Sequence, residues 1–104
     1  VYFHSALEGR KAECLRRSPR VCLSCVGDTR VPPGKFTTLF ESAVAFGRAE
    51  EVTEDDEKIH ALQLLCQRHT PDNMENFPKA VAKSLSRTGV WRITVEEITG
   101  KAKR

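Results

Sequence analysis

The stretch Leu39–Val52, with the sequence LFESAVAFGRAEEV, is the longest segment of the chain that has the pattern of a single β-strand. Alternation would place Phe40, Ser42, Val44 and Phe46 on one face and Ala43, Ala45 and Ala49 on the other. A strand with apolar side chains on both faces belongs in the interior of a barrel or a sandwich. Gly47 interrupts the pattern and predicts a bend of the kind that closes small barrels.

Shorter patterns on both sides of this stretch predict the remaining elements. We expect strands over Val1–His4, Val21–Val26 and Val90–Ile98, and helices from about Ala6 to Arg17, from a Thr53 cap to about His69, and over Pro78–Ser86. The long loop Thr29–Thr38 offers side chains for a pocket, with a mobile surface loop as the alternative. Residues 100–104 form a basic end that we expect to be solvated. This order predicts an α+β fold, an antiparallel barrel-like sheet with two to three flanking helices.

Size and charge place the chain among ordinary globular proteins. Its 104 residues are enough for one domain with one core, so we expect residues 1–104 to form a single domain. No apolar run reaches the roughly 18 residues of a membrane span and no signal peptide is visible, which favours a cytoplasmic protein without a membrane partner. A net charge of +3 is too low to indicate a nucleic-acid partner by itself.

The four cysteines, Cys14, Cys22, Cys25 and Cys66, do not form a recognisable metal or redox motif. Cys22 and Cys25 have C-x-x-C spacing, but no second pair accompanies them. Strand alternation would place their two sulfur atoms on opposite faces of a sheet. We therefore expect no metal site, and we expect reduced, mostly buried thiols.

The segment Phe3–Lys11 is the best candidate for a functional site. Ser5 and Glu8 have the S-x-x-E spacing of a capping box, which predicts a helix that begins at about Ala6. Backbone amides at such a helix start lie at the positive end of the helix dipole, where they suit a phosphate group.

Two positively charged residues follow this predicted helix start in the sequence. Arg10 and Lys11 would add full charges beside these amides, and Gly9 would allow a ligand to approach the backbone closely. Cations near a helix N-terminus are mildly unfavourable, which a bound anion would explain. The alternative is an ordinary capped surface helix with solvated cations.

Five segments carry a family resemblance. They are Tyr2–Ala6 (YFHSA), Gly9–Lys11 (GRK), Leu15–Val21 (LRRSPRV), Ser42–Val52 (SAVAFGRAEEV) and Ile98–Lys101 (ITGK). In this order and at these separations they resemble the FMN-binding split-barrel proteins. More narrowly, they resemble the pyridoxamine 5'-phosphate oxidase-like branch that includes the nitroimidazole-resistance (Nim) proteins. Family members carry further strands before this point, so we expect the domain to lack its first strands.

The resemblance implies an antiparallel split β-barrel and a homodimer that holds FMN in a groove between two subunits. Arg10 and Lys11 match the basic pair that binds the flavin phosphate in the oxidases. The serine of that motif is absent, and Ser5 is expected to take its place. His4 matches a histidine of the Nim-like branch and would lie near the flavin or the substrate as the catalytic residue. Ser42 lies where the oxidases carry a polar residue that contacts the flavin.

The resemblance also implies the activity. We expect an FMN-dependent oxidoreductase that acts on nitroaromatic or related small molecules, with His4 as a proton donor. Pyridoxamine phosphate oxidation itself is not expected, because the C-terminal substrate residues of those enzymes are not evident. A non-catalytic module that holds a flavin or a haem is the alternative. A weaker alternative is nucleic-acid binding through Arg10, Arg16, Arg17 and Arg20.

Overall fold

The computed structural model describes all of residues 1–104. The strands are β1 (Tyr2–Ala6), β2 (Arg20–Arg30), β3 (Leu39–Glu51) and β4 (Thr88–Lys103). The helices are α1 (Arg10–Arg17), α2 (Asp55–His69) and α3 (Phe77–Ser84). Short 3-10 helices, Pro71–Asn76 and Leu85–Arg87, join α2 to α3 and α3 to β4.

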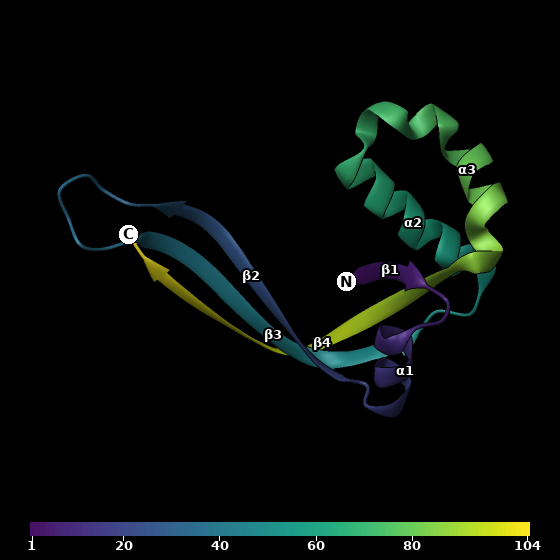
Figure 1. The fold of residues 1–104 in the computed structure, drawn as a ribbon, viewed down its shortest axis with the longest axis horizontal. Coiled ribbons are helices and arrows are strands. Elements are labelled where there is room, and N and C mark those ends of the chain that lie inside the picture. The colour runs from purple at the N-terminus through teal and green to yellow at the C-terminus, as the bar shows by residue number, and fades with distance from the viewer.

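All the strands belong to one antiparallel sheet with the order β1-β4-β3-β2. β3 and β4 pair along almost their whole length, from Glu51 opposite Trp91 to Phe40 opposite Lys103. β1 pairs only with the first part of β4, Thr88–Arg92. The far part of the sheet is therefore an arm of β2, β3 and β4 that projects from the helical end of the molecule (Figure 1).

Neighbouring residues of β4 face different helices. Trp91 packs with Ala12 of α1 in one apolar cluster, whereas Val90 packs with Ala61 of α2 in another. Because adjacent side chains of a strand point to opposite faces, α1 covers one face of the sheet and α2 covers the other. Only 11 of the 104 residues are buried, and both clusters lie at the helical end, so the arm has little core of its own.

The bend predicted at Gly47 is confirmed as a β-bulge. Phe46 lies opposite Glu97 and Gly47 lies opposite Val95, so the register of β3 and β4 shifts between them. A Cβ atom at position 47 would collide with the carbonyl oxygen of Thr94. Glycine is therefore what allows the two backbones to approach this closely, and the extra residue in β4 adds local twist to the sheet.

The predicted start of the first helix is wrong. β1 continues to Ala6, which pairs with Thr88, and α1 begins only at Arg10. Gly9 precedes it with φ +136°, a conformation that favours glycine. The predicted capping box does not form, and the Ser5 hydroxyl instead donates to the carbonyl oxygen of Ala6 (2.9 Å). The backbone around Ser5 is committed to the ladder with β4, so it cannot open a helix there.

The last strand is longer than predicted. β4 ends at Lys103 rather than Ile98, so most of the basic end is part of the sheet. β3 supplies a partner over this extra length, as far as Phe40. Arg104 then forms an ion pair with Glu41 (3.0 Å). The available partner strand, and not the hydrophobic alternation, determines where β4 ends.

The loop between β2 and β3 lies at the tip of the arm (Figure 1). It covers residues 31–38, slightly fewer than the predicted Thr29–Thr38, because β2 continues to Arg30. The aromatic ring of Phe36, in this loop, is fully exposed. The loop therefore encloses no pocket around this ring within one chain.

The four cysteines are free. The prediction that most of them are buried is wrong, because Cys14, Cys22 and Cys25 are exposed and only Cys66 is partly covered. Cys22 and Cys25 lie on the arm, where no helix covers the sheet. No group of His, Cys, Asp and Glu side chains has the arrangement of a metal site. No helix has the length and apolar character needed to span a membrane.

Replacing Gly47 by alanine should lower the free energy of unfolding by about 1–3 kcal/mol, because the new methyl group has no space beside the Thr94 carbonyl. Gly27→Ala is the matched control, since a Cβ atom there meets nothing closer than 3.5 Å. Denaturant unfolding followed by circular dichroism measures both variants. Equal stability of the two would contradict this role of Gly47.

Candidate functional site

The first turn of α1 is an uncapped helix start. Gly9 occupies the N-cap position, and no side-chain hydrogen bond caps the turn. The first helical bond runs from the Glu13 N–H to the carbonyl oxygen of Gly9 (3.0 Å). The amides before Glu13 therefore have no partner within the helix. Because the predicted capping box is absent, more donors are free for an anion than the sequence indicated.

Arg10 and Lys11 add two positive charges to this group of donors. Both side chains are exposed, and neither forms an ion pair or a hydrogen bond within the chain. The other two cations of α1 differ, because Arg16 and Arg17 are both paired with carboxylates. Arg10 and Lys11 are thus the unpaired cations of α1, at the helix end where the dipole attracts an anion.

Arg16 joins three parts of the chain. Its Nε and Nη2 atoms donate to the carboxylate of Glu51 at the end of β3 (3.1 and 2.8 Å). Nη1 donates to Glu8 (3.3 Å), and Nη2 also donates to the carbonyl oxygen of Leu7 (3.1 Å). The hydrogen bond from Arg16 lowers the pKa of Glu51, and the bond to Glu51 raises the pKa of Arg16. The turn Leu7–Gly9 is thereby tied to the sheet.

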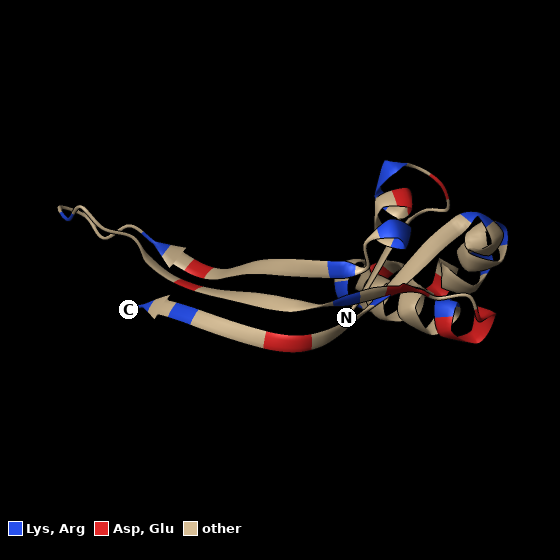
Figure 2. Ribbon diagram, turned by 90° about the horizontal axis from the view of Figure 1, so that it is seen from below, with Lys and Arg blue, Asp and Glu red and all other residues tan.

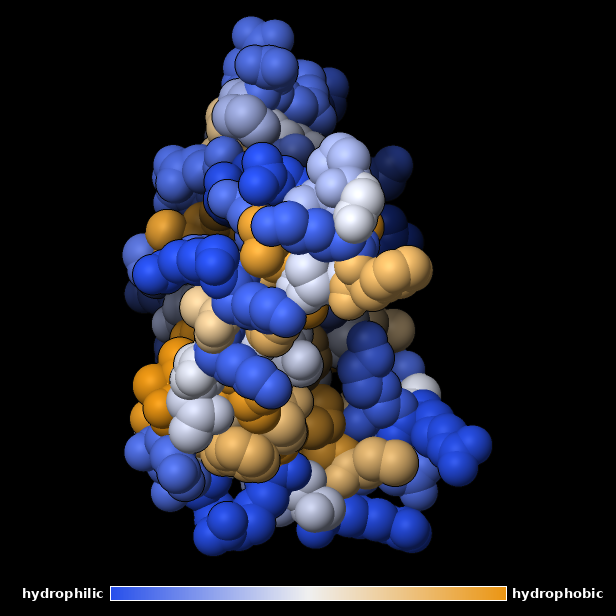
Figure 3. Space-filling view, turned by 90° about the vertical axis from the view of Figure 1, so that its left-hand side faces the viewer, coloured by the Kyte–Doolittle hydropathy of each residue, from blue (hydrophilic) through white to orange (hydrophobic).

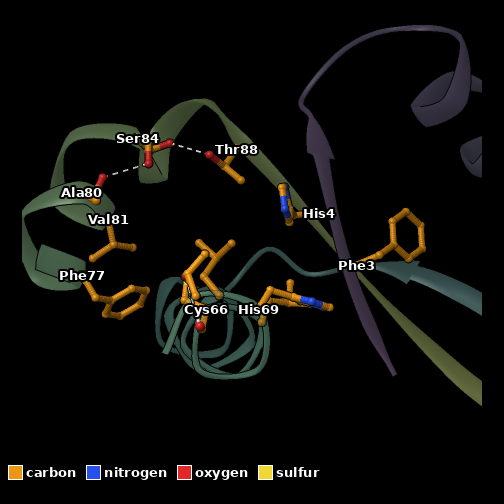
Figure 4. Close-up of a pocket in the computed structure, with 12 residues that line it drawn as sticks. Phe3, His4, Cys66, His69, Phe77, Ala80, Val81, Ser84 and Thr88 are labelled. Carbon is orange, nitrogen blue, oxygen red and sulfur yellow. Dashed lines mark hydrogen bonds between the residues drawn. The ribbon is translucent and has the colours of Figure 1, made fainter. Parts of the chain in front are cut away.

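The two predicted site residues of β1 face opposite sides of the sheet. Ser5 shares a face with Phe3, whose ring stacks on Trp91 in the cluster beneath α1. His4 shares a face with Tyr2, whose hydroxyl reaches a carboxylate of α2. Figure 4 shows the side chains of His4 and Phe3 directed to different sides of the strand. Ser5 therefore lies on the same side as α1, and His4 does not.

His4 lines a cavity of about 560 Å³ between β1, α2 and α3 (Figure 4). The other lining residues are mostly apolar: Leu62, Leu65, Cys66, His69, Thr70, Phe77, Ala80, Val81, Ser84 and Thr88. Phe3 also borders the cavity, although its ring points to the other side of β1. The hydroxyl groups of Ser84 and Thr88 are already bonded to backbone carbonyl oxygens. The imidazoles of His4 and His69 have no hydrogen-bond partner, and the cavity has a volume that suits a small molecule.

Sequence reasoning missed the contribution of α2 to this cavity. Cys66 and the exposed residue His69 were given no role in a site. Both line the cavity with Leu62 and Leu65. These four positions recur at the spacing of one helix face. A histidine that ends the apolar face of a helix was the signal that could have found the site.

Ser42 lies far from the other predicted site residues. It pairs with Lys101 on the arm, whereas His4 pairs with Val90 at the helical end. The strand between these two pairs spans roughly 35 Å at about 3.3 Å per residue. A single chain therefore brings Ser5, Arg10 and Lys11 to one face, places His4 on the other face, and leaves Ser42 apart.

Comparison with known proteins places this geometry in a family. The family model described as pyridoxamine 5'-phosphate oxidase matches residues 1–102. A search of curated proteins finds no match. Among solved structures, a candidate 5-nitroimidazole antibiotic resistance protein from Bacteroides thetaiotaomicron is 29% identical, with a TM-score of 0.76 over 97% of this chain and 60% of that one. The chain thus spans about three fifths of the length of that relative.

Two further structures share the fold at lower identity. The flavocytochrome Anf3 from Azotobacter vinelandii is 22% identical, with a TM-score of 0.76 over 100% of this chain and 50% of that one. An FAD-binding protein from Mesorhizobium loti is 21% identical, with a TM-score of 0.63 over 99% and 67%. The predicted α+β split barrel with flanking helices is confirmed. The chain belongs to the pyridoxamine 5'-phosphate oxidase family.

Proposed function

We propose that this chain binds FMN and serves as a flavin-dependent oxidoreductase of the Nim type, acting on nitroaromatic or related small molecules. The observation that carries the proposal is the uncapped start of α1 with its two unpaired cations, Arg10 and Lys11. Family membership and flavin-binding proteins of the same fold support a flavin as the ligand. A cytoplasmic location is part of the proposal.

A flavin phosphate fits the residues present at this helix start. Gly9 has open space around it, since a Cβ atom there would meet nothing within 4 Å. The free amides of the first turn and the two cations are the donor set that a phosphate group requires. Ser5 lies on the same face and is proposed to assist, although its hydroxyl now donates to the Ala6 carbonyl oxygen. FMN, when bound, supplies the electron transfer.

The cavity lined by His4 is the proposed place for the small-molecule substrate. Its apolar walls would exclude water from a flat molecule, and the free imidazole of His4 can donate a proton to it. His69 lies at the same cavity and offers a second polar contact.

We further propose that the protein is a homodimer with FMN between the subunits. The radius of gyration is 17.3 Å, whereas a compact domain of this length has about 13 Å. One row of β4 side chains changes from buried to exposed along the arm: Trp91 2%, Ile93 5%, Val95 40% and Ile98 65%. Viewed from the arm end, the surface shows hydrophobic areas between hydrophilic side chains (Figure 3).

A second copy would cover this apolar row on the arm. Ser42 faces the other side of the arm, because it shares a face with Val44 and Thr99 and not with Ile98, so covering this row does not by itself bring Ser42 to the FMN. A nucleic-acid partner is not part of the proposal, since Lys and Arg are interspersed with Asp and Glu around the helical end (Figure 2).

Ile98→Lys should weaken the dimer, because it places a charge in the apolar row that the second copy covers. Thr99→Lys is the matched control, since its side chain points to the opposite face of the same strand. Sedimentation velocity at several protein concentrations measures the association. A wild-type protein that stays monomeric, or two variants that associate equally, would contradict the proposed interface.

Removing both Arg10 and Lys11 by alanine substitution should weaken FMN binding by at least about 100-fold, because each charged hydrogen bond contributes about 1.5–3 kcal/mol. Riboflavin, which lacks the phosphate, should bind the wild type and the double variant equally. Flavin fluorescence titration measures both ligands. Unchanged FMN affinity in the double variant would show that these residues are not the phosphate anchor.

The non-catalytic alternative is separated from the enzyme by a turnover test. The flavin-loaded protein is reduced without oxygen and mixed with a nitroaromatic compound, and reoxidation is followed by flavin absorbance. Wild type should reoxidise, and His4→Ala should do so about 100-fold more slowly while keeping its FMN affinity. His60→Ala is the control, because His60 lies against Tyr2 outside the cavity. Absence of reoxidation in the wild type would favour the binding module.

A further inference from the structure

The turn Leu7–Gly9 has no regular structure of its own, yet it sets the position of the first turn of α1. Gly9 adopts φ +136°. The backbone bond that reaches the turn from α1 joins Glu13 to Gly9 (3.0 Å). The side-chain bonds that hold the turn all come from Arg16, to the Glu8 carboxylate and to the Leu7 carbonyl oxygen. The placement of this turn therefore depends on one guanidinium group.

Arg16 is itself fixed from the other side. Arg16 forms a bidentate bond with Glu51, the last residue of β3. Glu51 pairs in turn with Trp91 of the inner strand β4. A bidentate guanidinium–carboxylate pair has a defined direction as well as an attraction. The sheet, through Glu51 and Arg16, thus holds the turn that precedes the uncapped amides.

The same contact also changes the charge near the proposed phosphate site. Glu8 lies two residues before Arg10, and its carboxylate is largely exposed. An unpaired carboxylate there would repel a phosphate dianion. Arg16 pairs with it at 3.3 Å and offsets that repulsion. Arg17 offers no such link, because its ion pair is with Glu13 of the same helix.

We propose that Arg16 is a positioning residue for the phosphate site. It holds the Leu7–Gly9 turn and neutralises Glu8, so that the first-turn amides, Arg10 and Lys11 face one anion. This inference rests on the proposed function, in which Arg10 and Lys11 bind the FMN phosphate. Arg16 does not contact the phosphate itself, since its donors are committed to Glu51, Glu8 and Leu7.

The test compares FMN with riboflavin by fluorescence titration of the purified protein. Arg16→Ala should weaken FMN binding about tenfold, the loss expected when one of the charged hydrogen bonds from Arg10 or Lys11 to the phosphate is displaced, and should leave riboflavin affinity unchanged. Arg17→Ala is the matched control and should bind both flavins as the wild type does. Arg16→Lys keeps the charge but not the bidentate geometry, so it should recover only part of the FMN affinity.

Glu51→Ala separates positioning from simple electrostatics. This substitution removes the negative charge of the Glu51 carboxylate. If charge alone mattered, the phosphate would be repelled less and FMN would bind more tightly. The positioning role requires FMN binding to weaken instead, because Arg16 is no longer held by the sheet. Circular dichroism confirms that each variant is folded before titration.

Besides FMN binding that does not weaken in Glu51→Ala, three results would overturn the inference. The first is a loss of FMN affinity in Arg10→Ala but not in Arg16→Ala. This result would support Arg10 as a phosphate ligand and show that Arg16 does not position the site. An equal loss of FMN and riboflavin affinity in Arg16→Ala would show a general structural role. Unchanged FMN affinity in both Arg10→Ala and Arg16→Ala would show that the phosphate does not bind at this helix start, and the positioning role of Arg16 would then also be wrong.

Discussion

The pairing of β3 with β4 is the interaction on which the rest of the structure depends. These strands are joined through α2 and α3 and not by a tight turn, yet they pair from Glu51 opposite Trp91 to Phe40 opposite Lys103. The start of β4 carries β1 on its free edge, and α1 and α2 pack on its two faces. Where these partners end, the sheet continues as an exposed arm. The bulge at Gly47 marks the change between the two regions.

This arrangement explains why the predicted site residues are distributed rather than gathered. β1 alternates, so Ser5 faces α1 while His4 faces α2 and α3. The helix start and the cavity are thus formed on opposite faces of the same short strand. In the proposed dimer, a second copy covers the apolar face of the arm, whereas Ser42 lies on the other face. Because β1 is the edge strand of the sheet, a flavin whose phosphate lies at α1 would have to pass this edge for its ring to meet a substrate in the cavity.

Much of the fold could be predicted because its signals are local. The alternation in Leu39–Val52 located β3 to within one residue, and the apolar spacing after Thr53 gave the end of α2 at His69. The errors arose where distant residues decide the outcome. Ser5 and Glu8 have a helix-capping spacing, but pairing with β4 keeps this backbone in a strand. The end of β4 depends on the length of β3, and a sequence pattern does not contain that information.

The candidate site was predictable to a similar extent. The charge pattern of Arg10 and Lys11 indicated an anion site, and the structure leaves both unpaired at an uncapped helix start. The opposite directions of His4 and Ser5 follow from alternation once β1 is known to continue past them. The bonds of Arg16 to Glu51, 35 residues along the chain, could not be predicted, because only the folded sheet brings those groups together.

The absorption spectrum of the protein after exposure to FMN tests the central claim most directly. The purified protein is mixed with FMN, and free flavin is removed by gel filtration before the spectrum is recorded. The account predicts that the protein fraction is yellow and keeps the visible flavin bands, shifted from those of free FMN. A colourless protein fraction, with all of the FMN eluting as free flavin, would contradict it.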